Sequence, residues 1–131
     1  AKEPLKLQQW THLAGVFDGQ SVTLFVDGKK QDSKAATGER RGNDLPLFLG
    51  ADPDSSGNPT RGFTGQLDEF RLSKTVRYSE DFEPAARFDP DEKTILLHHF
   101  DRSVGPFLLD HSSSAGHGIL GNSSRLVPVE R

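Results

Sequence analysis

The sequence predicts an all-β fold of short antiparallel strands, and three observations support this prediction. Only 33% of the 131 residues are apolar, and the chain contains 13 Gly and 8 Pro, a composition that favours many strands and turns over long helices. Two Asp-Gly turns separate β-rich segments near the N-terminus. The apolar run at 62–72 alternates like a strand but slips by one residue in its middle. By its length, the chain forms one domain.

The two turns predict a three-stranded antiparallel meander. Strands are expected at 10–17, 21–26 and 29–37, with turns at Asp18-Gly19-Gln20 and Asp27-Gly28 between them. Asp-Gly is a strong hairpin signal, because glycine readily adopts the positive φ that tight turns require.

The middle strand of this meander has one fully apolar face. Val22, Leu24 and Val26 share that face, whereas Thr23 and Phe25 share the other. Side chains of a strand alternate between the two sides of a sheet. We therefore expect the even-numbered residues to face the core.

Two further strands are expected before residue 73. A polar loop at 38–44 leads to the nearly continuous apolar run at 45–49, which is typical of a strand covered on both faces. After the loop at 51–61, the run at 62–72 carries its slip at the acidic pair Asp68-Glu69. Such a slip indicates a bulge or a passage from one sheet environment to another.

The last third of the chain begins with a charged segment that has neither a helical nor a strand period. Residues 74–93 are interpreted as an extended connector, with one helical turn at 79–82. The apolar run at 94–100 predicts a strand.

These segments together resemble a laminin-G-like, concanavalin-A-type jelly-roll module. WTHLAGVFDG, VTLFVDGK, LPLFLGAD and GFTGQLDEFRL resemble the C-terminal half of such a module, and the tail at 95–120 resembles the strands that open one. In the tail the pattern is carried by Phe100-Asp101, Gly105, Asp110, Ser112, Gly116 and Gly118, whereas Ala115 and the serine run depart from it. The resemblance implies an antiparallel two-sheet sandwich.

The order of these pieces leaves two arrangements open. Residues 1–73 resemble the back half of a module, 74–93 form the connector, and 94–131 resemble the opening of a module. Either the chain is a piece of a tandem array with two incomplete modules, or the trailing strands complete the sheet begun by the first half. Unpaired apolar edges associate readily, so pairing within the chain or with a second copy is expected.

Composition excludes several partners. The net charge is −3 and Lys and Arg are scattered among Asp and Glu, so no basic stripe is available for nucleic acid. No apolar run approaches the roughly 20 residues that span a bilayer, and the N-terminus lacks a signal-peptide core. The absence of cysteine excludes disulfides and thiolate metal sites.

A calcium ion is the expected cofactor, with two candidate positions. Asp52, Asp54 and Asn58 place oxygen donors around Gly57, similar to the start of a calcium loop, although Phe63 stands where an EF-hand needs its bidentate Glu. The alternative is an ordinary turn whose Asp and Asn bond their own backbone.

Asp68 is the other candidate ligand. The family resemblance implies that an acidic residue on the last long strand helps to hold a structural calcium ion. The alternative is that Asp68 accepts hydrogen bonds from backbone donors at the bulge, while Glu69 and Arg71 pair on a solvated face.

The histidines and aromatic residues give weaker signals. His98 and His99 are adjacent in a strand and point to opposite faces, so hydrogen-bonded or surface histidines are expected rather than a zinc site. The resemblance implies a buried Trp10, while Tyr78 in the connector is expected to be more accessible.

No catalytic motif is found. Glycosidases need two acids flanking the sugar bond, but Asp89, Asp91 and Glu92 lie in the connector and are interpreted as a solvated charge run. No G-x-S-x-G motif precedes a helix. The resemblance therefore implies non-catalytic recognition of a glycan or an extracellular protein, outside the cytoplasm. The alternatives are a fragment of a glycoside hydrolase or lyase and a spacer without a ligand.

Overall fold

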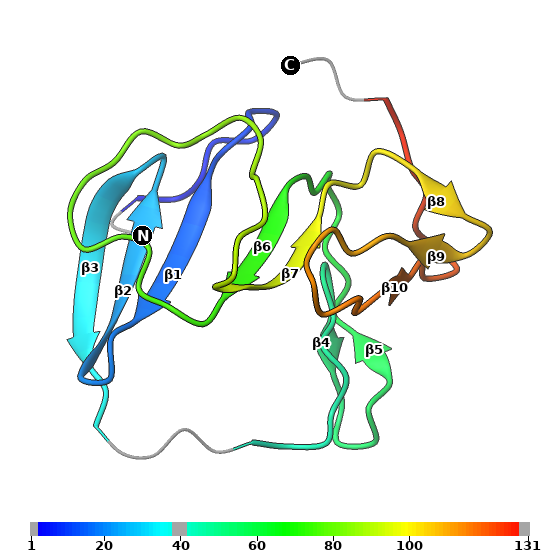
Figure 1. Cartoon of the computed structure of the whole chain (residues 1–131), viewed down its shortest axis with the longest axis horizontal. Coiled ribbons are helices and arrows are strands. Elements are labelled where there is room, and N and C mark those ends of the chain that lie inside the picture. Colours follow the sequence, from blue (N-terminus) through cyan, green and yellow to red (C-terminus); the bar gives the residue numbers. More distant parts are fainter. Residues whose placement is uncertain (1–2, 38–41, 129–131) are drawn as a thin grey trace. The chain divides into compact units, whose positions relative to one another are not determined.

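The computed structural model describes residues 3–37 and 42–128, and these residues form antiparallel strands without any helix (Figure 1). The all-β prediction is confirmed. It follows that no helix in the described part could span a membrane. The chain divides into two compact units, one made of residues 1–38 and 69–131 and the other of residues 39–68.

The predicted meander is confirmed in the larger unit. β1 (Leu13–Phe17), β2 (Ser21–Val26) and β3 (Lys29–Ala35) form a sheet in the order β1-β2-β3 (Figure 1). Gly19 and Gly28 have φ of +95° and +72°, which is the conformation that their turns require.

The prediction of which face of β2 points inward is wrong. Phe25 is fully buried and Thr23 is nearly so, whereas the Val22 side chain is 47% exposed. The rings of Tyr78 and Phe82 pack against Phe25, with centroid distances of 6.3 and 5.6 Å. The connector therefore covers the odd-numbered face, and the even-numbered face stays open.

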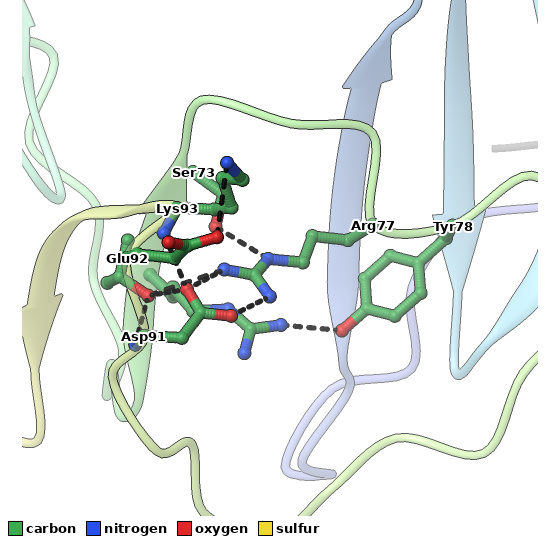
Figure 2. Close-up of polar contacts among 8 residues, drawn as sticks. Ser73, Arg77, Tyr78, Asp91, Glu92 and Lys93 are labelled. Carbon is green, nitrogen blue, oxygen red and sulfur yellow. Dashed lines mark hydrogen bonds and ion pairs between the residues drawn. The ribbon is translucent and has the colours of Figure 1, made fainter.

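Arg77, within the connector, bonds residues near both ends of the connector. The two Nη atoms of Arg77 each donate to the Asp91 carboxylate at 2.6 Å, and its Nε donates to Ser73 Oγ at 3.0 Å (Figure 2). The hydrogen bonds from Arg77 and then Thr94 hold the pKa of Asp91 well below its usual range. Asp89, Asp91 and Glu92 are all exposed, as expected of a solvated charge run, and Asp91 in addition forms a bidentate ion pair with Arg77.

The expected helical turn at 79–82 is absent because its polar groups bond the β2–β3 turn. Phe82 N donates to Gly28 O at 2.9 Å. The Asp81 carboxylate accepts from Lys30 N at 2.9 Å and from Lys29 Nζ at 3.2 Å. These bonds replace the internal hydrogen bonds of a helical turn.

A second sheet of the larger unit pairs the two strands that flank the connector. β6 (Phe70–Ser73) pairs antiparallel with β7 (Thr94–His98) (Figure 1). The expected strand at 62–72 begins only at Phe70, because Glu69 has a φ of +53°, which a strand does not accommodate. The slip in the sequence marks the boundary between the two units.

The smaller unit contains one short hairpin, β4 (Asp52–Pro53) with β5 (Pro59–Thr60). No strand forms at 45–49. Pro46 within this run has no N–H to donate to a neighbouring strand. The expected loop at 38–44 lies outside the described residues over 38–41.

The tail forms a small third sheet that a buried carboxylate ties to β7. β8 (Ser103–Val104), β9 (Phe107–Leu108) and β10 (Gly118–Ile119) pair in the order β10-β9-β8. Asp110 accepts hydrogen bonds from Leu97 N of β7, Ser112 Oγ and Gly116 N, at 2.7 to 2.8 Å. The D-x-S spacing of Asp110 and Ser112, which resembles the family pattern, therefore serves to hold the tail against β7.

Replacing Gly28 by Ala is expected to destabilise the protein more than replacing Gly19. A Cβ on Gly28 would collide with the carbonyl of Phe82, whereas a Cβ on Gly19 would meet nothing within 4 Å. Both substitutions carry the cost of a positive φ, about 1 kcal/mol, and G28A adds a backbone collision, for a total of about 3 kcal/mol. Urea unfolding of both variants measures this, and equal losses would contradict the contact.

Asp110→Asn is expected to lower the free energy of unfolding in a pH-dependent way. Burial raises the pKa of Asp110, but the hydrogen bonds from Ser112, Leu97 and Gly116 outweigh it and lower the pKa from 3.8 to about 2. The carboxylate therefore stabilises the fold above about pH 4, by about 2 kcal/mol, and this stabilisation is lost as the pH falls towards 2.

The difference between wild type and D110N, measured by urea unfolding, should thus shrink from neutral to acidic pH. A difference that is constant over that range would show that the charge on Asp110 is not responsible.

Candidate functional site

The predicted calcium loop is a closed turn in the structure. Asp54 Oδ1 accepts from Ser56 N at 2.8 Å and from Asn58 N at 2.9 Å, and Asn58 Nδ2 lies 3.3 Å from Asp54 Oδ2. The backbone donors of Asn58 and Ser56 lower the pKa of Asp54. Asp52 forms an ion pair with Arg61 at 3.1 Å. N–H donors and a guanidinium thus hold these carboxylates, and calcium at Asp52, Asp54 and Asn58 stays a prediction.

Asp68 is half-buried and directly precedes Glu69. Within residues 3–37 and 42–128, no three His, Cys, Asp or Glu side chains come together as potential metal ligands. Calcium at Asp68 stays a prediction.

A buried acid–histidine cluster was missed by the sequence reasoning. The Glu69 carboxylate, 9% exposed, lies 2.9 and 3.0 Å from Nδ1 of His99, which is 6% exposed. Phe88 N donates to it at 3.0 Å, and Arg87 Nη1 lies 3.4 Å away. The alternative in which Glu69 pairs with Arg71 on a solvated face does not hold, because Glu69 is buried against His99.

Arg71 lies elsewhere because the positive φ at Glu69 turns the two side chains apart. Its guanidinium lies 4.1 Å from the centre of the Phe88 ring and donates to the Tyr78 hydroxyl at 2.9 Å. A cation over an aromatic face is favourable, so Arg71 connects β6 to the connector. Tyr78, expected to be accessible, is partly covered by these contacts.

A second histidine extends the acid–histidine cluster. The His111 ring lies 4.3 Å from the His99 ring, and Arg87 Nη2 forms an ion pair with Asp101 at 2.8 Å. Burial and then the neighbouring His99, Arg102 and Arg87 lower the pKa of His111. The side chains of the Glu69–His99 pair are only 9% and 6% exposed. We assign it a structural role.

The remaining histidines are mostly hydrogen-bonded, as expected. His98 Nδ1 lies 3.0 Å from Leu109 O, and His117 Nδ1 accepts from Asp110 N at 3.1 Å. His12 differs, because its buried Nδ1 has no partner and burial lowers its pKa. No sequence signal distinguishes these environments, which depend on contacts between distant segments.

An accessible apolar surface of the larger unit lies on the open side of the β1–β2–β3 sheet. The strand register places Leu13 opposite Val26 and Phe17 opposite Val22, so their side chains share the face of Leu24. Leu13 is 54% and Phe17 44% exposed. We call these five residues the apolar face.

Trp10, just before β1, is also exposed. Its exposed fraction is 48%, so the expectation of a buried tryptophan is wrong. The connector rings occupy the inner side of the sheet, and the indole remains accessible. An exposed indole offers a flat apolar surface with one N–H donor.

One comparison with known proteins identifies the family. The family model Laminin_G_3, described as the concanavalin A-like lectin/glucanases superfamily, matches residues 1–81. It confirms the family resemblance and the jelly-roll fold class. No solved structure was found to match the chain significantly.

Glu69→Gln is expected to destabilise the protein by about 2 kcal/mol, because a charged acceptor of several hydrogen bonds becomes a neutral amide in a buried place. Glu83→Gln in the exposed connector is the control. Thermal unfolding of the two variants measures this. A melting temperature for E69Q equal to that of E83Q would contradict the importance of the Glu69–His99 pair.

Proposed function

Because the chain belongs to the concanavalin A-like lectin/glucanase superfamily, we propose that it is part of a non-catalytic recognition module of a secreted or surface protein. Its ligand is a glycan or an extracellular protein. Laminin-G-like domains are typically non-catalytic and commonly extracellular, although the superfamily includes glycoside hydrolases.

The exposed apolar surface carries this proposal. Leu13, Phe17 and Val22 expose between 44% and 54% of their surface, and contiguous exposed apolar side chains are typical of interaction sites. Trp10 adds an indole that can stack on the apolar face of a sugar ring. Binding to this surface needs no chemical step.

The arrangement of the acids argues against the rival hydrolase. A glycosidase needs two carboxyl groups that reach the same sugar bond. In the described part of the chain, Arg77 holds Asp91 in a bidentate pair, and Glu69 is buried against His99. Glu69 is thus withdrawn from the surface, and Asp91, although 44% exposed, is engaged by Arg77.

A structural calcium ion at Asp68 is the second part of the proposal. Extracellular calcium modules bind at roughly 10⁻⁴ to 10⁻³ M, so the ion would raise the melting temperature only at millimolar concentration. Equal melting temperatures in excess chelator and in millimolar calcium would reject this part and leave the recognition role untouched.

Trp10→Ala is expected to weaken glycan binding about tenfold, equivalent to about 1.4 kcal/mol. The control is Ile119→Ala in β10, which removes an apolar side chain that is also exposed. The ligand is first identified on a glycan array, and hydrolysis of the same polysaccharides is measured in parallel.

Three outcomes separate the hypotheses. Recognition of a glycan is supported if the protein binds without turnover and if W10A, but not I119A, weakens the binding. Turnover would support the enzyme. If neither binding nor turnover is seen with calcium present, the chain either binds a protein ligand or is a spacer. A screen of extracellular proteins separates these two hypotheses.

A further inference from the structure

The His12 ring lies between the β1–β2–β3 sheet and the connector. His12 directly precedes β1, and its ring makes edge-to-face contacts with the Phe82 and Phe88 rings, at centroid distances of 5.5 and 6.2 Å. Both phenylalanines belong to the connector, and Phe82 also packs on Phe25. The imidazole is therefore part of the contact by which the connector covers this side of the sheet.

One turn holds His12 and Phe82 next to each other. His12 N donates to Asp27 Oδ1 at 2.8 Å, and Asp27 N donates to His12 O at 2.8 Å. Phe82 N donates to the carbonyl of Gly28, the next residue of that turn. The backbone of His12 is thus fixed on one side of the contact and that of Phe82 on the other.

The buried ring nitrogen of His12 favours the neutral imidazole. The chain itself encloses Nδ1, which has no hydrogen-bond partner in the part of the chain that the structure describes. In a neutral ring this nitrogen can be without a proton, whereas in the imidazolium both nitrogens carry one. A buried charged donor without an acceptor is strongly unfavourable.

Two charged groups act on the ring from neighbouring elements. Asp27, in the β2–β3 turn, favours the protonated form. Arg71 of β6, whose guanidinium lies 4.1 Å from the centre of the Phe88 ring, disfavours it. Burial has the largest effect, and the pKa of His12 is lowered from 6.5.

The remaining charged and titratable groups around Phe82 and Phe88 bond other residues or are exposed. Their bonds join Asp81 to Lys29 and Lys30, Arg87 to Glu69 and Asp101, Glu69 to His99, and the Tyr78 hydroxyl to Arg71. Glu83 and Asp89 are exposed.

Two attachments of the connector persist in mild acid. The hydrogen bond from Lys30 N lowers the pKa of Asp81, and the hydrogen bond from Arg77 lowers the pKa of Asp91. Both carboxylates therefore stay ionised at pH 5 and keep their bonds. An opening of the connector in mild acid is thus confined to the segment between residues 81 and 91.

We propose that His12 is an acid-sensitive contact that holds residues 82–88 of the connector on the sheet. The neutral ring packs against Phe82 and Phe88, and protonation of the ring releases them. The stabilisation is complete above about pH 6.5, the pKa of histidine in an unfolded chain, and is lost as the pH falls through the lower pKa of the packed ring. Release uncovers the Phe25 ring, which the connector otherwise buries.

The first experiment uses the wild-type chain. The ring proton resonances of His12, followed by NMR between pH 8 and pH 4, should titrate below pH 6.5. The protection factor of the Phe82 amide, which corrects for the intrinsic pH dependence of hydrogen exchange, should fall about tenfold between pH 7 and pH 5.

The second experiment compares two histidine variants. His12→Phe keeps an aromatic ring that cannot be protonated, so the protection factor of the Phe82 amide should be the same at pH 7 and pH 5. The control is His111→Gln, because the pKa of His111 is also lowered by burial but its ring contacts His99 instead of the connector rings. This variant should keep the wild-type pH dependence.

Four results would overturn the proposal. They are a His12 ring that titrates at or above pH 6.5, a wild-type protection factor that does not change between pH 7 and pH 5, an H12F variant that keeps the wild-type pH dependence, and an H111Q variant that loses it. The first two need no substitution, so the proposal can be rejected even if H12F does not fold.

Discussion

The packing of Tyr78 and Phe82 on Phe25 is the contact on which the larger unit depends. The two connector rings stack at 3.5 Å, and Phe25 beneath them is fully buried. Aromatic side chains bury large apolar areas and dominate the energetics of protein cores, so this cluster stabilises the sheet. The approach of Phe82 requires a residue without Cβ at position 28, which links the tight turn to the core.

The same contact explains why the opposite side of the sheet is accessible. Since the connector covers one side, Leu13, Phe17 and Val22 remain on the other. Arg77 and Asp91 hold the ends of the connector (Figure 2), and Arg71 ties β6 to it through the Tyr78 hydroxyl. The surface proposed for recognition follows from the face of the sheet on which the connector packs.

Sequence patterns within a few residues correctly predicted the features that depend only on neighbouring residues. The two Asp-Gly turns and the meander are confirmed, and the strand predicted at 94–100 forms over 94–98, because each depends on adjacent residues. At 45–49 the apolar composition favours a strand, but Pro46 disfavours one because it has no N–H to donate. The slip at Asp68-Glu69 was located correctly, although its cause is a positive φ rather than a bulge within one long strand.

Features that join distant segments were not predictable from pattern alone. The inward face of β2 depends on rings more than 50 residues away in the sequence, and the Glu69–His99 pair spans 30 residues.

The most direct test of this account is hydrogen exchange at the Phe82 amide. This amide lies outside any strand but donates to Gly28 O at 2.9 Å, next to the aromatic cluster. The account predicts exchange as slow as that of hydrogen-bonded amides within β2, because both open only when the cluster separates. Exchange of the Phe82 amide at the rate of an unstructured segment, while β2 stays protected, would contradict it.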